Sequence, residues 1–354
     1  MHNILRNFLL VLVFSCLYSF QVNAQIGVFG TYKFLGYTNS ARIAGMGGNF
    51  LAINDNDITL TQANPSLITP AMSNNLALSY VNSPGGINYG FVMYSYNFTK
   101  VGSFVGSLQF INYGKFTGAD PAGNLTGDFS ASEYALNVGW GRQLSPLFSI
   151  GANGKLIYSQ LESYRSFGIA VDVAGTYNSK DQSFTASLIG RNIGTQIVPF
   201  VAGQYEPLPF ELQIGLSQKL KHIPLRFSQL LTNLQRWDLT YLDESDPDNT
   251  PDPITGEVEE QTGIGKFADG LMRHIVLGAE ITIAKAFSVR VGYNYQRRQE
   301  LKLYDKAGLT GFSIGAGLRV KMFNLSYTRG SYTAGLPRNY ITVAVNLQEF
   351  AKKQ

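Results

Sequence analysis

The chain has 354 residues and a formal net charge of +4 at pH 7, with 28 Lys and Arg against 24 Asp and Glu. For a chain of this length that excess is too small to argue for nucleic-acid binding. Its single cysteine, Cys16, lies in a segment that we expect to be removed on export. The mature chain is therefore expected to have no disulfide framework, cysteine metal site or thiol nucleophile.

Residues 1–24 have the pattern of a cleavable signal peptide. Arg6 gives a positive start, residues 8–20 are an apolar run, and Val22-Asn23-Ala24 is a small-residue cleavage pattern. The apolar run is shorter than the ~20 residues that a membrane-spanning helix needs. We therefore predict export with cleavage before Gln25. A retained N-terminal anchor and a lipoprotein are the alternatives.

Residues 25–74 precede the first clear strand, and their central part fits neither a clean helix nor a clean strand. The stretch 40–68, "SARIAGMGGNFLAINDNDITLTQANPSLI", mixes Gly, Asn and Asp with scattered apolar residues. If a wide barrel follows, its lumen is too large for wall side chains alone to fill, so we predict that this segment folds inside it as a plug. The residues assigned to this plug and lumen site are Arg42, Gly45, Gly47, Gly48, Asp55, Asp57, Asn64 and Pro65.

Two features of the plug segment suggest how it is held. The glycines of "GMGG" permit turns with positive φ and a close approach to the wall. Asp55 and Asp57 supply carboxylates that lumen arginines such as Arg290 and Arg319 could pair with. The alternative is that the two aspartates only cap turns.

From residue 75 to residue 350 apolar residues alternate with small or polar ones. In 133–142, "EYALNVGWGR", one face holds Tyr134, Leu136, Val138 and Trp140 and the other holds mostly small residues. A period of two indicates strands with one apolar face. The segments "FGIAVDVAGTY", "FELQIGLS", "IVLGAEITI", "FSVRVGYNY" and "FSIGAGLRV" repeat the pattern.

The face opposite the apolar one distinguishes a membrane barrel from a soluble sheet protein. It carries Gly, Ala, Ser and Asn with isolated charges, whereas aromatic residues often begin or end the apolar face. Aromatic residues at strand ends suit a membrane–water interface. After residue 24 there is no apolar helical run, so a membrane protein of this sequence must be a closed barrel. We predict a transmembrane antiparallel β-barrel; a periplasmic all-β repeat protein is the alternative.

Connection lengths agree with a barrel. Short turns alternate with longer loops, as in outer-membrane barrels with short periplasmic turns and longer external loops. The alternation gives about fourteen strands if 223–241 is one long strand. The longest loops are expected at 114–132, 192–209 and 242–270, where we expect partners to bind.

The third of these loops is strongly acidic. Residues 243–270 hold nine acidic residues and one lysine. A solvated external loop is one interpretation, and a docking surface for a partner protein is the other. The candidate partner-binding residues are Asp243, Glu244, Asp246, Asp248 and Asp252. Their spacing is not that of a calcium loop.

Signals of catalysis or cofactor binding are missing from the sequence. The mature chain has two histidines, His222 and His274, and no metal-ligand spacing. There is no GxSxG motif and no nucleotide-binding glycine motif. His274 and Glu280 would lie about 20 Å apart along one strand, too far to hydrogen bond. We therefore assign no catalytic residue, no metal site and no cofactor.

The stretch 40–68 resembles the N-terminal pattern of the fatty-acid-transporter-like barrels. It has an Arg- and Gly-rich start, an Asp-containing middle and the element Asn64-Pro65-Ser66, where the family usually has Asn-Pro-Ala. Together with 224–244, "PLRFSQLLTNLQRWDLTYLDE", the mature chain is similar to the PorV-related barrels of the Bacteroidetes type IX secretion system.

The resemblance implies a non-enzymatic outer-membrane anchor. It would hold a PorZ-like surface protein in an attachment complex with PorV and the PorU sortase, which cleaves secreted cargo and links it to lipopolysaccharide. It also implies contact with membrane lipid or lipopolysaccharide and none with nucleic acid. The alternative function is an outer-membrane transporter for small hydrophobic molecules such as fatty acids.

Overall fold

The structure is a computed structural model that describes residues 30–48, 50–240, 263–284, 286–301, 308–333 and 336–351. The residues from Thr31 onward form one compact unit. The expected signal peptide, with its cleavage site before Gln25, lies outside the described residues.

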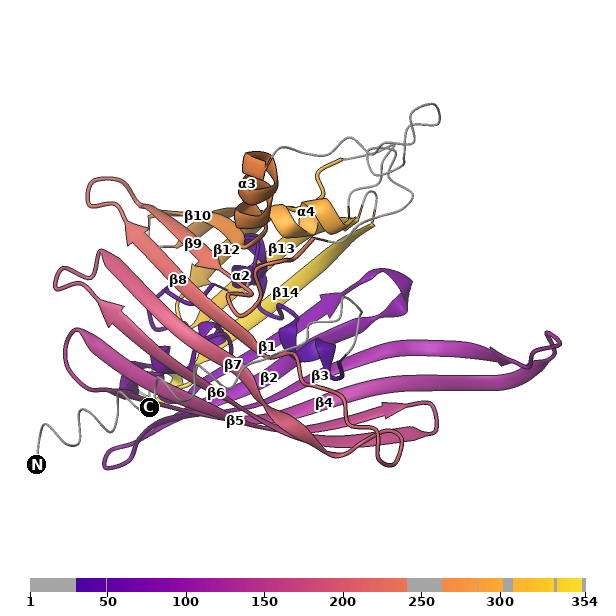
Figure 1. Ribbon diagram of the computed structural model, residues 1–354. Helices are drawn as coiled ribbons and strands as arrows, with labels where there is room; N and C mark the ends of the chain where they lie inside the picture. Colours follow the sequence, from indigo (N-terminus) through magenta and orange to yellow (C-terminus); the bar gives the residue numbers. More distant parts are fainter. Residues whose placement is uncertain are drawn as a thin grey trace, which may run out of the picture. The chain divides into compact units, whose positions relative to one another are not determined.

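The described part of the chain forms fourteen antiparallel strands. Each strand pairs with the next, and β1 also pairs with β14, so the sheet closes into a barrel (Figure 1). This confirms the predicted fold class and strand number. The strands are β1 Asn75–Asn82, β2 Asn88–Phe98, β3 Gly102–Ala119, β4 Leu125–Gln143, β5 Phe148–Leu161, β6 Tyr164–Asn178, β7 Phe184–Val198, β8 Glu211–Lys219, β9 Leu225–Leu231, β10 Ile275–Ile283, β11 Phe287–Asn294, β12 Phe312–Val320, β13 Phe323–Thr333 and β14 Leu336–Asn346.

Side chains alternate across the wall as the sequence pattern requires. In β6, Phe167 and Ile169 are exposed on the outer face, whereas Ala170 and Asp172 are buried on the inner one. Outward residues are large and apolar because they face hydrocarbon in a membrane. Inward residues are small or polar because a second layer of chain packs against them.

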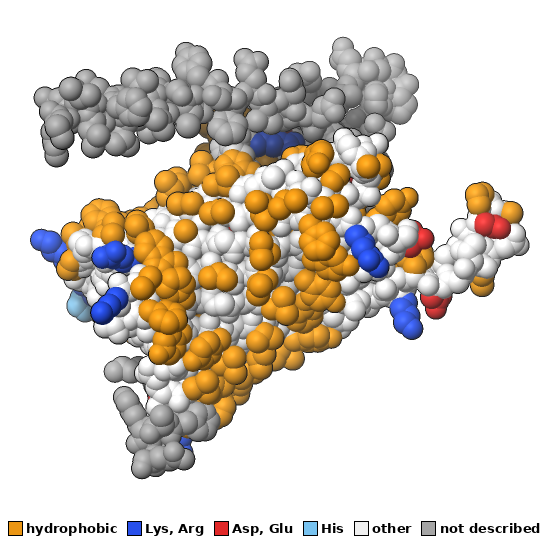
Figure 2. All heavy atoms as spheres, turned by 90° about the horizontal axis from the view of Figure 1, so that it is seen from below, with side chains coloured by type: hydrophobic (Ala, Val, Ile, Leu, Met, Phe, Trp, Pro, Cys, Tyr) orange, Lys and Arg blue, Asp and Glu red, His pale blue; other side chains and the backbone are white. Residues whose placement is uncertain are grey.

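The outer face is an apolar belt. Figure 2 shows one side of the barrel, where hydrophobic side chains are spread over the middle and most of the Lys, Arg, Asp and Glu side chains lie towards the two ends. Leu136, Val138 and Val173 each keep half or more of their surface exposed within this belt. A soluble monomer rarely exposes so extensive an apolar surface. Among the described residues no helix has both the length and the apolarity to cross a bilayer.

The two ends of the barrel differ. Short turns join each even-numbered strand to the next one, from β2–β3 to β12–β13. The other end carries the β3–β4 hairpin and the helices α3, Gly263–Arg273, and α4, Tyr295–Leu301 (Figure 1). Because short turns are periplasmic in outer-membrane barrels, we take the second end as external.

The prediction of a loop at 114–132 is wrong. β3 and β4 continue as 18- and 19-residue strands joined by a turn at 120–124, and they project as a long hairpin (Figure 1). The first six residues of β4 are all exposed, so both faces of this hairpin meet solvent. Without a lipid face the apolar alternation disappears, which is why the sequence resembles a loop.

Two other expected boundaries differ. The expected loop at 192–209 begins later, because β7 continues to Val198. The single strand expected over 223–241 is only β9, Leu225–Leu231. Beyond it Asn233 adopts a left-handed conformation, with φ 55°, that ends the strand. The region still contributes one strand, so the predicted count of fourteen holds.

The plug consists of residues 31–74 and fills the lumen as a series of short turns. Its elements are η1 Lys33–Gly36, α2 Ala41–Gly45, η2 Ile58–Leu60, η3 Pro65–Leu67 and η4 Pro70–Met72. Phe34, Met46, Phe50 and Leu51 are essentially fully buried. Phe34 packs in a cluster with the wall residue Ile157, and the other three pack in a second cluster with Ala174. The hydrophobic core of the molecule therefore lies between the plug and the wall. The short helices η5, Pro84–Gly86, and α5, Gln348–Ala351, lie outside the plug sequence.

Candidate functional site

The contact between plug and wall is the candidate functional site, and Arg42 lies at its centre. Arg42 belongs to α2 and is 6% exposed. Its guanidinium donates to Asp55 at 2.9 and 2.5 Å and to Asp57 Oδ2 at 2.9 Å. It also reaches the wall, donating to Glu280 of β10 from Nε at 3.1 Å and from Nη2 at 2.8 Å. One guanidinium thus joins three carboxylates.

Wall arginines complete the cluster. Arg290 of β11 donates from Nε to Glu280 Oε1 at 2.7 Å, and Arg226 of β9 acts electrostatically on Asp55. Three guanidiniums therefore accompany three carboxylates, which is the condition under which buried charges are tolerated.

Among the described residues neither Arg290 nor Arg319 forms the expected direct ion pair with a plug aspartate, although Arg290 lies in the same cluster and interacts electrostatically with Asp57. Arg290 pairs with Glu280 instead, and Arg319 is exposed at the end of β12. The two aspartates pair with Arg42 of the plug itself, because the turn after α2 brings 55–57 back onto that helix.

In the plug half of this cluster, attraction between opposite charges keeps Arg42 and Asp55 ionised. Burial disfavours the charged form of the Arg42 guanidinium. The carboxylates of Asp55, Glu280 and Asp57 outweigh this effect and hold the pKa of Arg42 well above its ordinary value. Burial likewise opposes the charge of Asp55, and the Arg42 guanidinium more than compensates, so the pKa of that carboxyl lies below its ordinary value.

Asp57 and Asn64 also fix the local fold of the plug. Asp57 caps η2 by accepting from the Thr59 N–H at 3.0 Å, so this aspartate both caps a turn and pairs with Arg42. Asn64 caps η3 and donates from Nδ2 to the Leu51 carbonyl at 2.7 Å and to Thr176 of β6 at 3.1 Å. Pro65 follows at the first position of η3, where its missing N–H costs nothing.

The plug glycines lie against the wall. Gly47 has φ +101°, and a side chain there would come within 3.0 Å of the Tyr293 amide nitrogen. A Cβ added to Gly45 would lie 2.7 Å from Thr328 Oγ1, so the glycine leaves room for that hydroxyl. A Cβ added to Gly48 would make only ordinary contact with Val276. The wall matches this approach, because an added Cβ on Gly292 would collide with the Met46–Gly47 peptide.

A second buried charge cluster lies on β5, β6 and β7, and sequence reasoning missed most of it. Lys155 Nζ lies 2.8 Å from Asp172 and donates to Asn192 Oδ1 at 2.6 Å. The Asn192 N–H donates to Asp172 at 2.8 Å and holds a bulge in β7, where Asn192 has φ 55°. Lys155 and Arg191 occupy inward positions in strands with the two-residue alternation. A charged residue at such a position is a signal from which the sequence could have predicted them.

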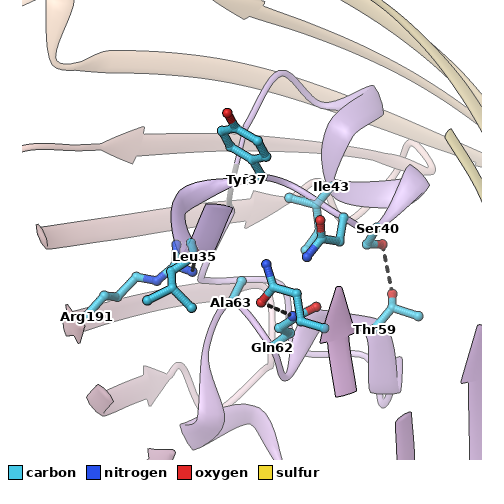
Figure 3. Close-up of a pocket in the computed structure, with 10 residues that line it drawn as sticks. Leu35, Tyr37, Ser40, Ile43, Thr59, Gln62, Ala63 and Arg191 are labelled. Atoms are coloured by element: carbon cyan, nitrogen blue, oxygen red, sulfur yellow. Dashed lines mark hydrogen bonds between the residues drawn. The ribbon is translucent and has the colours of Figure 1, made fainter. Parts of the chain in front are cut away.

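Arg191 lines a small cavity between this cluster and the plug. Figure 3 shows Arg191 reaching from the wall towards Leu35, with Tyr37 and Gln62 on other sides of the space. Arg191 Nη2 donates to the Leu35 carbonyl at 3.4 Å, and Gln62 donates to Gln109 at 2.9 Å. The cavity measures about 10 Å³, room for about one water molecule.

The acidic partner-binding candidates lie outside the described residues. These are Asp243, Glu244, Asp246, Asp248 and Asp252, and their proposed role stays a prediction. Among the described residues, His274 has Nδ1 2.7 Å from the Thr232 carbonyl oxygen and Nε2 3.0 Å from the Trp237 carbonyl oxygen, both of which are acceptors.

Comparisons with known proteins identify the fold. No family model and no curated protein matches the chain. Among solved structures, the toluene transporter TodX of Pseudomonas putida aligns over 87% of this chain and 96% of its own, with 12% identity and a TM-score of 0.50. A TodX monoaromatic hydrocarbon channel mutant, deltaS2, aligns over 88% and 98%, with 13% identity and a TM-score of 0.52.

A third similar structure is the toluene transporter TbuX of Ralstonia pickettii, with 11% identity over 88% of this chain and 97% of its own, at a TM-score of 0.49. At these identities the likeness establishes the architecture alone. The likeness to the two TodX structures shows that the chain shares their β-barrel fold.

Proposed function

We propose that this barrel is a non-enzymatic outer-membrane anchor in type IX secretion, equivalent to PorQ. It would hold a PorZ-like surface protein beside PorV and the PorU sortase, and so support cargo processing and attachment to the cell surface. The resemblance of the plug segment and of 224–244 suggests this role. The comparisons with solved structures name no secretion component.

The observation that carries the proposal is the filled lumen. Large plug side chains such as Phe34 and Phe50 are buried against the wall, and the cavity at Arg191 holds about 10 Å³. That volume is far below the ~300 Å³ of ordinary small-molecule sites. A barrel whose interior is occupied in this way is suited to present a surface rather than to pass a solute.

The external end offers such a surface. The β3–β4 hairpin extends beyond the neighbouring strands (Figure 1), and Phe116 stacks on Phe129 there with ring centroids 5.3 Å apart. Trp237 stacks on Phe267 of α3 at the same end. Aromatic side chains exposed to solvent are typical of protein interfaces.

Deletion of the gene tests the proposal in cells. We expect the peripheral surface protein to appear in the medium and cargo to remain unattached. A matched variant replaces 116–129 with a two-residue turn, which keeps the Lys115–Ser130 pair and the wall below it. It should insert into the membrane at normal levels yet lose the partner in pull-downs. If deletion leaves cargo attachment normal and pull-downs recover no surface protein, the proposal fails.

Transport of small hydrophobic molecules such as fatty acids is the second candidate, and the comparisons favour it. The solved barrels of this fold are named a toluene transporter and a hydrocarbon channel. Two features of β7 fit it: a bulge at Asn192, and pairing with β8 that stops at Arg191 although β7 continues to Val198. The segment that contains Leu208 bonds to this part of β7, however: the Glu206 N–H donates to Gln196 at 2.7 Å and Asn192 donates to the Pro209 carbonyl at 2.9 Å. Leu208 itself is buried, at 8% exposed.

Liposome uptake separates the two candidates. Purified barrel in liposomes should not admit a labelled fatty acid or toluene faster than empty liposomes if the lumen is closed. Uptake that increases when Leu208 is replaced by Gly would favour transport through the wall at β7. Wild-type uptake above the empty-liposome control would overturn the closed-lumen argument.

A further inference from the structure

The external helix α3 presents its apolar face to the outside of the molecule. Ile264, Phe267 and Leu271 recur three or four residues apart, so they lie on one face of the helix. Their exposed fractions are 84%, 59% and 40%. A helix on the surface of a soluble protein turns its apolar face towards the core. The orientation of α3 is therefore the reverse of the ordinary one.

The opposite face of α3 is polar and packs against the protein. The Tyr295 hydroxyl of α4 donates to Asp269 at 2.7 Å. Arg273, which is 8% exposed, donates to Asp269 at 2.6 Å and to Gln296 of α4 at 3.3 Å. α4 contacts both β10 and β13, which are separated in the sheet by β11 and β12, so it lies on the inner side of the rim. The apolar face of α3 therefore points away from the mouth of the barrel.

The wall next to α3 is short. Only His274 separates α3 from the start of β10 (Figure 1). The neighbours of β10 in the sheet are β9, with seven residues, and β11, with eight, whereas β3 to β7 have 14 to 19. A strand needs about 9–11 residues to cross the hydrocarbon layer of a bilayer. On this side of the barrel the strands alone leave the apolar belt short at the external rim.

The exposed face of α3 continues this belt. Ile275 and Leu277 begin the outward face of β10 directly after the helix, and Leu277 is 39% exposed. Trp237 stacks on Phe267 with ring centroids 5.5 Å apart and is itself 55% exposed. Girdles of aromatic side chains flank the lipid-facing band of outer-membrane barrels. The position of Trp237 and Phe267 at the rim fits such a girdle.

We propose that the apolar face of α3, together with Trp237, contacts the acyl chains at the external boundary of the surrounding bilayer. The helix then extends the belt over the short strands, while Lys266 on its opposite face stays on the water side. The Trp237–Phe267 pair becomes a lipid contact, and the β3–β4 hairpin remains the protein-facing part of the external end. This inference is independent of whether the barrel anchors a protein or transports a solute.

Spin labels test which face of α3 meets lipid. The chain from Gln25 onward has no cysteine, so a single one can be placed at Ile264, at Lys266 on the opposite face, or at Phe129 of the hairpin. Each labelled protein is folded into phosphatidylcholine vesicles without any partner protein. The label at 264 should collide mainly with oxygen, which concentrates in hydrocarbon. The labels at 266 and 129 should collide mainly with a nickel chelate, which stays in water.

Trp237 gives a second measurement that leaves α3 unchanged and does not depend on folding of the cysteine variants. Trp140→Phe makes Trp237 the only tryptophan. Its emission should fall when the acyl chains of the vesicles are brominated, and iodide in the water should quench it little. If either Ile264→Cys or Trp237 proves open to the aqueous reagent, the proposal fails. Shielding from both kinds of reagent would mean that a second copy covers the face, and would overturn it as well.

Discussion

Arg42 of the plug and Glu280 of β10 form a two-point ion pair, with Nε–Oε1 at 3.1 Å and Nη2–Oε2 at 2.8 Å. Both side chains are almost completely buried. The pair connects the N-terminal segment to a strand 238 residues further along the chain. It is a direct polar link between plug and wall, and it makes the position of the plug testable.

Replacing Arg42 should release the plug. Arg42→Met leaves Asp55, Asp57 and Glu280 without their shared cation, and breaking a buried ion pair from one side costs about 3–5 kcal/mol. We expect amide hydrogen exchange over 40–68 to accelerate while the strands stay protected. Arg319→Met removes an exposed arginine and should change stability by less than about 0.5 kcal/mol. Equal effects of the two variants would contradict the assigned role of Arg42.

Acid should loosen the same contact. The pKa of Asp55 in the folded chain lies below its ordinary value of 3.8, so its ionised form stabilises the plug fully above that pH. The stabilisation is lost as pH falls below 3.8 and through the folded pKa. Protease sensitivity of the plug should therefore rise on acidification below about pH 4.

Asp55→Asn is the matched test of this pH dependence. It should weaken plug protection already at pH 7 and remove the part of the acid response that Asp55 contributes. An acid response of the same size in both proteins would assign the titration to another group.

Wall glycines that contact the plug should be less replaceable than those facing lipid. Gly292→Ala places a methyl group against the Met46–Gly47 peptide, and overpacking of this kind costs about 1–3 kcal/mol. Gly154→Ala is the control, because nothing lies within 4 Å of its added Cβ. Thermal unfolding in detergent compares the two; a Gly292→Ala protein as stable as Gly154→Ala would show that the plug lies elsewhere.

Charge on the outer face should separate the membrane belt from the projecting hairpin. Val138→Arg puts a cation on the exposed apolar face of β4, at a cost of about 2–4 kcal/mol if that position lies near the middle of the bilayer. Phe129→Arg lies on the same strand in the hairpin, where water solvates the charge. We expect folding into lipid vesicles to be impaired by the first change only. Equal impairment would place the hairpin in the membrane.

The barrel could be predicted because its signal is local. Alternation along "FGIAVDVAGTY" indicates one lipid-facing side and one inward side of a strand. The turns are also recognisable from the residues that directly follow each strand. The β3–β4 hairpin could not be predicted in this way, because residues such as Phe116 and Phe129 have solvent on both faces and lose the alternation. The boundary of β9 was missed for a related reason, since the left-handed conformation of Asn233 depends on its surroundings.

The plug site was only partly accessible to sequence reasoning. The plug residues were selected for composition: glycines for close approach and aspartates for charge. Their partners depend on three-dimensional packing, and one sequence does not reveal that Arg42 lies beside Glu280. The buried Lys155 and Arg191 needed one further step, namely that a long polar side chain at an inward position of a barrel must find a partner inside.

The long separation between Arg42 and Glu280 also constrains the order of assembly. The plug is made early in synthesis. Its turns η3 and η4 lie against β2, β4, β5 and β6, which follow soon, whereas α2, which carries Arg42, lies against β11 to β14 and Glu280 of β10, which are made last. Until those last strands have joined the sheet, Arg42 can pair with Asp55 and Asp57 but lacks Glu280. Closure of the cylinder and seating of α2 must therefore occur together as a late event, so a chain truncated before β10 should leave α2 without a place to dock.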